Sequence, residues 1–153
     1  MKLRTKHNGY FEVDSLQEVM AILTQLGWTE EEDGFLVCDN GSRGFVQVAK
    51  WRPGQYIVEW CAGDDPTCPR HGLRRAQYQD SANEIIDFGH QEMGQFNLYQ
   101  NDLLTLRDML DVLTAFWCGR SWLSRVCWRD QAPEMRKFIQ LNDDRHARMS
   151  LRG

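Results

Sequence analysis

The sequence has no long apolar run, and no segment approaches the roughly 18 consecutive apolar residues that a membrane-spanning helix requires. The basic residues at the start of the chain lead into no apolar segment, so they lack the pattern of a secretory signal. A glycine-rich phosphate-binding loop, the Gly-x-Ser-x-Gly nucleophile motif, the His-Glu-x-x-His metal motif and internal repeats are also missing. We therefore expect a soluble, cytoplasmic protein with no membrane partner and no signature of these enzyme classes.

Histidine is scarce, and cysteine occurs in an odd number without the spacing of a disulfide framework. The five cysteines are Cys38, Cys61, Cys68, Cys118 and Cys127. Four of them lie in apolar or strand-like segments, where a free thiol behaves as a small apolar side chain. These features predict reduced thiols in a cytosolic protein.

A chain of 153 residues is long enough to bury one substantial core and short for two. We predict a single domain over residues 1–141 and a polar, flexible tail over residues 142–153. The net charge of −4 is unevenly distributed: residues 1–119 carry 10 Lys and Arg against 18 Asp and Glu, and residues 120–153 carry 8 against 4. An acidic body repels nucleic-acid phosphates and attracts basic proteins, although a charged surface also serves solubility alone.

Two segments have the apolar periodicity and the end signals of an amphipathic helix. The first begins at a Ser15 cap, with Glu18 three residues on, and ends before Gly27. The second begins at Thr105 and ends at Gly119. Its apolar face carries Leu106, Met109, Leu110, Leu113, Phe116 and Trp117. We expect this wide face to make the second helix a main element of the core.

The clearest strand signal is a hairpin over residues 44–60, in which two β-branched and aromatic arms flank Pro53 and Gly54. The other predicted strands are residues 35–38, 85–88, 96–99 and 121–130. Residues 62–75 are rich in Gly, Pro, Asp and Arg and predict a loop, and Pro133 predicts a further short helix. Successive strands with short turns indicate an antiparallel meander. The predicted fold class is α+β: one domain in which an antiparallel sheet packs against two main helices.

Possible metal ligands gather over residues 61–71, where Cys61, Cys68 and His71 supply two thiolates and an imidazole. Zinc takes four protein ligands in a structural site, and no nearby residue has the spacing of a fourth. We therefore predict no metal and no cofactor. A catalytic Cys68 would need an oriented base, and no pattern places a histidine firmly beside it.

Glu59 is an ionisable residue inside a mostly apolar strand, so its carboxylate must be paired or have a raised pKa. An ion pair in the core is the favoured interpretation, with Arg125 or Arg129 on the last strand as the expected partner. A functional carboxylate is the alternative.

The chain has six tryptophans, and their positions differ in what they predict. Periodicity places Trp117, Trp122 and Trp128 in the core. Trp51 and Trp60 lie near the ends of the hairpin arms, where they are free to act as surface anchors for a protein partner.

In the order of these elements, the chain resembles the immunity proteins of bacterial polymorphic-toxin systems, of the type associated with deaminase-like toxins. The resemblance covers residues 13–130 and rests on Val58, Glu59 and Trp60 and on residues 116–119. It implies a small α+β protein that binds its cognate toxin stoichiometrically and blocks the toxin's active site, without a cofactor or turnover. The expected toxin is a deaminase or nuclease that acts on nucleic acid.

The contact residues of such proteins vary with the toxin, so we predict them from charge and position. They are Glu30, Glu31, Glu32, Asp33, Asp64 and Asp65 in two acidic turns, together with Trp51 and Trp60. We expect a monomer that binds a basic toxin domain and makes no direct contact with nucleic acid. Two other classes remain open: a small hydrolase that uses Glu59 or residues 61–71, and a ligand-binding regulatory module that uses Trp51 and Trp60.

Overall fold

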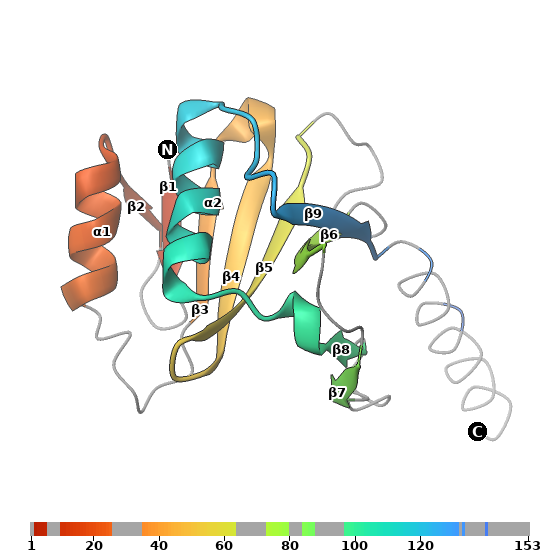
Figure 1. Cartoon of the computed structure of the whole chain (residues 1–153). Coiled ribbons are helices and arrows are strands. Elements are labelled where there is room, and N and C mark those ends of the chain that lie inside the picture. Colours follow the sequence, from red (N-terminus) through yellow and green to blue (C-terminus); the bar gives the residue numbers. More distant parts are fainter. Residues whose placement is uncertain are drawn as a thin grey trace, which may run out of the picture.

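A computed structural model describes residues 2–5, 10–25, 35–63, 73–79, 84–87, 97–131, 133 and 140. Its centre is a seven-stranded antiparallel sheet with the strand order β2-β1-β3-β4-β5-β6-β9, and β7 pairs with β8 in a small second sheet (Figure 1). The strands are β1 (Lys2–Thr5), β2 (Tyr10–Glu12), β3 (Phe35–Asp39), β4 (Phe45–Arg52), β5 (Gln55–Cys61), β6 (Leu73–Tyr78), β7 (Ile85–Asp87), β8 (Leu98–Tyr99) and β9 (Val126–Asp130). The helices are α1 (Leu16–Gln25) and α2 (Leu106–Cys118), with short 3-10 turns at Gly41–Arg43 and Gln100–Asp102. The predicted α+β class, with an antiparallel sheet and two main helices, is confirmed.

The predicted hairpin is present as β4 and β5. Its turn is made by Pro53 and Gly54, and Gly54 has a φ of 75°, which the second central position of a type II turn requires. Val46 pairs with Trp60, and Val48 with Val58. Both valines of β4 and Val58 are completely buried, so this hairpin forms the middle of the core.

Both predicted helices are confirmed, together with the start signals of both and the end signal of α2; Gly27, the predicted end of the first helix, lies outside the described residues. The backbone N–H of Glu18 donates to the Ser15 hydroxyl at 3.1 Å, which caps the start of α1. At the start of α2, the backbone N–H of Asp108 donates to the Thr105 hydroxyl at 3.2 Å. Gly119 ends α2 in the left-handed conformation, with a φ of 64°. Local capping chemistry therefore determines where each helix begins and where α2 ends.

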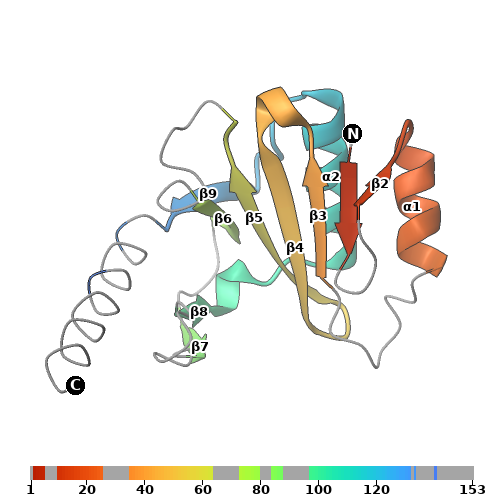
Figure 2. The same cartoon turned by 180° about the vertical axis from the view of Figure 1, so that it is seen from behind.

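The core lies between α2 and one face of the sheet. Alternate residues of β3, β4, β5, β6 and β9 point toward α2, while α1 lies beside the edge of the sheet that carries β1 and β2 (Figure 1). Figure 2, from behind, shows the sheet in front of α2. The buried residues that α2 contributes are Met109, Val112, Leu113, Ala115 and Phe116, with the charged Asp108. Leu106, which was predicted to lie on the apolar face, is instead 48% exposed.

Three strands were not predicted from the sequence. β1 and β2 are short strands at the edge of the sheet: Lys2 and Arg4 interrupt the apolar pattern of β1, and β2 has only three residues. β6 occupies part of the predicted loop over residues 62–75, since Arg74 and Arg75 interrupt its apolar pattern. Both arginines are accommodated because Arg74 stacks on Trp60 and Arg75 pairs with Glu59.

The last strand is shorter than predicted and begins at Val126 rather than at residue 121. The backbone N–H of Val126 donates to the carbonyl of Leu123 at 3.1 Å, so a turn precedes the strand. The two short strands predicted near residues 85–88 and 96–99 are present as β7 and β8 and pair with each other. The predicted helix after Pro133, apart from Pro133 and Gln140, and the tail over residues 142–153 lie outside the described residues.

The ladder between β5 and β6 joins only Glu59–Cys61 to Leu73–Arg75. The part of β5 that precedes Glu59 is therefore not paired with β6. The segment that follows β8 fills the gap, and Leu104 makes an antiparallel bridge with Tyr56 of β5. None of the helices in the described ranges is long and apolar enough to cross a membrane.

Candidate functional site

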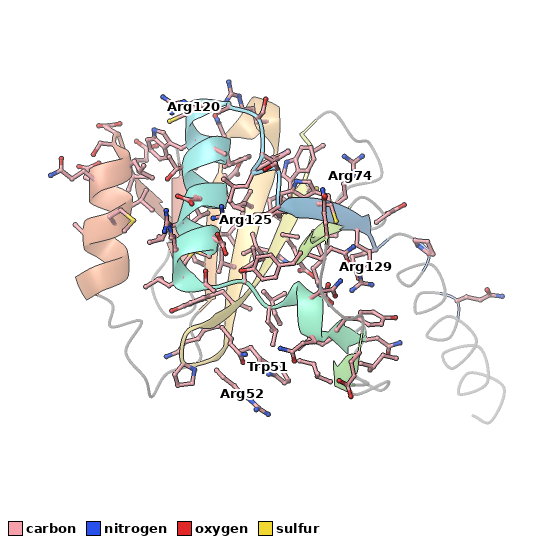
Figure 3. The ribbon with its side chains drawn as sticks, in the orientation of Figure 1. Trp51, Arg52, Arg74, Arg120, Arg125 and Arg129 are labelled. Carbon is pink, nitrogen blue, oxygen red and sulfur yellow. The ribbon has the colours of Figure 1, made fainter. Side chains whose placement is uncertain are left out.

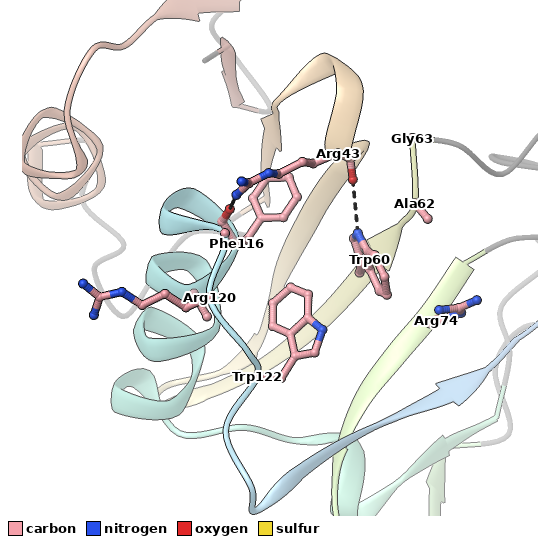
Figure 4. A pocket seen from close by; sticks show the side chains of 10 residues that line it. Arg43, Trp60, Ala62, Gly63, Arg74, Phe116, Arg120 and Trp122 are labelled. Atoms are coloured by element: carbon pink, nitrogen blue, oxygen red, sulfur yellow. Dashed lines mark hydrogen bonds between the residues drawn. The ribbon is translucent and has the colours of Figure 1, made fainter.

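A pocket with a volume of about 570 Å³ lies at the C-terminal end of α2, beside the ends of β5 and β6 (Figure 4). Its lining combines arginines with aromatic and small residues. These residues are Arg43, Trp60, Ala62, Gly63, Arg74, Ala115, Phe116, Gly119, Arg120 and Trp122. The volume falls in the range of about 300–1,000 Å³ that is usual for ligand pockets.

Three tryptophans form one cluster beneath the pocket. The ring centroids of Trp60 and Trp122 are 5.4 Å apart, those of Trp60 and Trp128 are 5.6 Å apart, and those of Trp122 and Trp128 are 4.8 Å apart. All three rings are tilted or edge-on to one another, which is the favourable geometry for aromatic pairs. Because β5, β9 and the segment before β9 each supply one ring, the cluster joins three separate parts of the chain.

Arg74 stacks on this cluster from the neighbouring strand. It is the cross-strand partner of Trp60, and its guanidinium carbon lies 5.1 Å from the centroid of the Trp60 ring. A guanidinium stacked on an aromatic ring keeps its N–H groups free for hydrogen bonds in its own plane. Asp130 is the cross-strand neighbour of Arg74 on the other side, yet no ion pair between described residues involves Arg74.

Arg43 closes the other side of the pocket and is held by the end of α2. Its Nη1 donates to the carbonyl of Phe116 at 3.3 Å, where the helix leaves its last carbonyls without helical partners. The indole N–H of Trp60 donates in turn to the carbonyl of Arg43 at 3.4 Å (Figure 4). The Arg120 guanidinium points away from Trp60 in the same view.

The backbone at the end of α2 explains why Arg43 fits there. The N–H of Arg120 donates to the carbonyl of Ala115 at 2.9 Å, and the N–H of Gly119 donates to the carbonyl of Phe116 at 3.3 Å. This is a Schellman motif, which requires a left-handed residue at Gly119. A methyl group at Gly119 would lie 2.0 Å from Nη1 of Arg43, so the absence of a side chain also makes room for the arginine.

The pocket is cationic within the described part of the chain. Arg43, Arg74 and Arg120 have no carboxylate partner among the described residues, and no described carboxylate lines the pocket. Its described lining also contains no serine, cysteine, histidine, aspartate or glutamate that could act as nucleophile or general base. The chemistry that these residues offer is therefore binding of an anionic group beside apolar rings.

Glu59 lies on the opposite face of the sheet and is fully engaged. Its Oε1 accepts from Arg75 Nη2 at 2.7 Å and from Arg75 Nε at 3.0 Å, and its Oε2 accepts from the Gln47 side chain. Burial lowers the pKa of Arg75, but the carboxylates of Glu59 and Asp102 together outweigh this effect, so the net pKa of Arg75 is raised. The expected core ion pair is present, but its partner is Arg75, not Arg125 or Arg129.

Arg125 and Arg129 pair with other carboxylates. Arg129 donates to Asp102 Oδ2 at 2.7 Å, and Arg125 forms an ion pair with Asp108 at the start of α2. The prediction for Glu59 was wrong in its partner because β6, which supplies Arg75, lies between β5 and β9 and was not predicted as a strand.

The structure separates the two tryptophans that were predicted to anchor a partner. Trp60 belongs to the pocket, whereas Trp51 lies near the turn at the opposite end of the hairpin (Figure 3). The Arg52 guanidinium carbon is 6.0 Å from the centroid of the Trp51 ring. An Arg–Trp pair therefore lies near each end of the hairpin, but the pair that lines the pocket combines Trp60 of β5 with Arg74 of the neighbouring strand β6.

The other predicted site residues lie outside the described part of the chain. These are Glu30, Glu31, Glu32, Asp33, Asp64, Asp65, Cys68 and His71. Among the described residues, no three His, Cys, Asp or Glu side chains are grouped as a metal site would require.

The prediction that all five thiols are reduced is wrong for Cys61, which is disulfide-bonded. Cys38, Cys118 and Cys127 are free, and burial raises the pKa of the Cys38 thiol to about 12. A disulfide depends on which parts of the chain the fold brings together, and the spacing of an odd number of cysteines does not reveal this.

Arg43, Arg74 and Trp122 were not identified from the sequence as site residues. Arg74 lay in a predicted loop, and Trp122 was assigned to the core, where it does make part of its contacts. The one sequence signal for this site was Trp60, an aromatic residue at the end of a predicted strand.

The chain matches no protein-family model, and no curated protein has significant similarity to it.

Proposed function

We propose that this protein is an immunity protein, which binds a bacterial toxin domain and blocks it without turnover. The observation that carries the proposal is the pocket at the end of α2, which is lined by two half-buried tryptophans and three exposed arginines. Tryptophan and arginine are the residues most enriched at the energetic centres of protein interfaces. The sequence resemblance to immunity proteins agrees with a binding role.

The pocket is built on a rigid frame, which favours tight binding. Trp60 is held by Trp122, Trp128 and Arg74, and Arg43 is held by the end of α2. Side chains that are already ordered lose little entropy on association. A stoichiometric inhibitor needs this property, because affinity rather than chemical rate determines its effect.

The two alternative functions have less support. The Glu59 carboxylate is engaged by Arg75 and Gln47, so a hydrolase that uses it would first have to break a buried network. A regulatory module that clasps one ligand between Trp51 and Trp60 would need the two rings to lie together. Trp60 pairs with Val46, five residues from Trp51 along β4, which corresponds to about 17 Å of strand.

The test is co-expression with the product of the adjacent gene, as the candidate toxin. We expect restored growth of the host cell and a stoichiometric complex on size-exclusion chromatography. Restored growth without a complex would instead favour an enzyme that reverses the damage. If co-expression neither restores growth nor yields a complex, the proposal is refuted.

A further inference from the structure

The pocket has a chemical preference that differs from the acidic character of the whole chain. The net charge of the protein is −4, yet every charged residue of the described lining is an arginine. Arg74 is exposed and stacked on Trp60, so its in-plane N–H groups are available to a ligand. A guanidinium presents these donors as a fork that matches a carboxylate or a phosphate.

The end of α2 does not cancel this positive charge. A helix C-terminus carries a partial negative charge of roughly half an elementary charge. Arg43 donates directly to the Phe116 carbonyl there, so this arginine offsets the helix end. Arg74 then remains as the cation beside the tryptophan rings, with no ion-pair partner among the described residues.

Carboxylate and phosphate remain to be distinguished. A nucleic acid brings many phosphates, which the acidic body of the chain repels at long range. A protein segment brings one or two carboxylates beside apolar side chains, and Trp60, Trp122 and Phe116 provide apolar surface for the latter. The mixed lining therefore fits an acidic peptide segment better than a polyanion.

We infer that the pocket formed by Trp60, Trp122 and Arg74 takes a carboxylate-bearing segment of the protein partner, and this inference rests on the proposed function. The partner presents an aspartate or glutamate to Arg74 and an apolar neighbour to the tryptophan rings. The partner surface at this contact is acidic, whatever the net charge of the toxin domain. The predicted acidic turns, which suit basic groups instead, lie outside the described residues.

The hairpin itself supplies a matched control. Arg52 and Trp51 form the same type of pair as Arg74 and Trp60, at the other end of the hairpin and outside the pocket. Both arginines are exposed, so Arg74→Glu and Arg52→Glu make the same charge change with little effect on the core. Arg43 is left unchanged because it also caps α2.

The first measurement is the Kd of the complex with the toxin domain. We expect Arg74→Glu to weaken binding at least about tenfold, and Arg52→Glu to change it less than about twofold. Arg74→Lys keeps the charge but loses the fork and the stacking, so its Kd should lie between wild type and Arg74→Glu. Unchanged or tighter binding by Arg74→Glu would overturn the inference.

The second measurement does not depend on the toxin. A short acetylated Glu-Leu-Glu peptide is titrated against the protein while the NMR signals of the indole N–H groups are recorded. We expect the signals of Trp60 and Trp122 to shift in wild type and in Arg52→Glu, but not in Arg74→Glu. The Gln-Leu-Gln counterpart should cause no shift.

Each result of the titration decides the pocket chemistry. Equal shifts with Gln-Leu-Gln, or larger shifts with inorganic phosphate or a single-stranded oligonucleotide at equal concentration, would overturn the carboxylate assignment. If wild-type protein forms no toxin complex, the proposed function fails, and the titration alone still tests the preference of the pocket for carboxylates.

Discussion

Arg75 Nη2 lies 2.7 Å from Glu59 Oε1 across two neighbouring strands, and the exposed fractions of the two side chains are only 7% and 13%. Arg75 also donates to the backbone carbonyl of Asn97 at 3.2 Å and lies 3.5 Å from Asp102. One buried cation therefore serves two carboxylates and a backbone carbonyl. These contacts tie the segment before α2 to the sheet at the point where β5 and β6 separate.

Replacement of Arg75 should destabilise the protein strongly. Arg75→Ala leaves the largely buried Glu59 carboxylate without its cation, while Asp102 keeps Arg129, and we expect a loss of about 3–5 kcal/mol in the free energy of unfolding. Arg74→Ala removes the exposed neighbour and should cost less than about 1 kcal/mol. Urea denaturation of both variants measures the difference. Equal losses would mean that Arg75 is not the organising cation.

The stability that Asp108 supplies should depend on pH. Burial raises the pKa of Asp108, but the hydrogen bonds from Tyr78, Arg125 and Thr105, together with the charge of Arg125, outweigh this, and the net pKa lies below its usual value. Because the folded pKa is depressed, the stabilisation is present above the unfolded pKa of about 3.9 and is lost as the pH falls through the folded pKa.

We therefore expect Asp108→Asn to be less stable than wild type at pH 7, and the difference to shrink below about pH 4. Denaturation curves at pH 7, 5, 4 and 3 measure it. The matched control is Asp111→Asn, since Asp111 is partly exposed and its contact with Arg125 is longer, at 3.4 Å. A difference for Asp108→Asn that stays constant with pH would contradict the role of its charge.

Truncation of the buried face of α2 should leave cavities. Leu113 and Phe116 have exposed fractions of 3% and 4%, and replacement of either by alanine should cost about 2–5 kcal/mol. Leu106→Ala is the control on the same helix, because Leu106 is 48% exposed. The shift of the denaturation midpoint reports the effect, and a midpoint unchanged in both core variants would mean that α2 does not pack as described.

Two glycines before β4 differ in how tightly the chain around them excludes a side chain, and Gly44, with a ψ of −148°, also has a conformation that is essentially confined to glycine. Gly41 and Gly44 both have positive φ, at 57° and 82°. A methyl group at Gly41 meets nothing within 4 Å, whereas one at Gly44 would lie 1.9 Å from the carbonyl oxygen of Cys61. Gly41→Ala should cost about 1–2 kcal/mol from its conformation alone. Gly44→Ala should cost roughly 1–3 kcal/mol more, because backbone must move. Thermal unfolding measures the loss of stability in each variant. Equal losses for Gly41→Ala and Gly44→Ala would contradict the prediction.

The acidic turns remain predicted contact sites for a basic part of the toxin. The double variant Asp64→Lys, Asp65→Lys should lower the association rate and reduce its dependence on salt, because exposed charges act mainly on the encounter. Replacement of Trp60 by alanine should instead raise the dissociation rate. Stopped-flow kinetics at several salt concentrations separates the two effects. Unaltered association in the double variant and in charge variants of Glu30, Glu31, Glu32 and Asp33 would exclude steering by these turns.

Local chemistry within the sequence determined the helices and the central hairpin. Ser15, Thr105 and Gly119 act on backbone groups within a few residues of themselves, and Pro53 and Gly54 determine the hairpin turn by their own φ preferences. Such signals do not depend on distant parts of the chain. The α+β class followed from them because short turns between strands leave only antiparallel pairing.

Only the tertiary structure decided which charges and rings meet. Glu59 pairs with Arg75 because β6 lies beside β5, although charged residues hide that strand in the sequence. Arg43, Trp60, Arg74 and Trp122 come from four separate segments and share one pocket. Their proximity arises from strand order and from the position of α2, which burial of the whole core determines. Long-range packing thus assembled the binding site, whereas short-range hydrogen bonds and backbone preferences had already specified the elements that carry it.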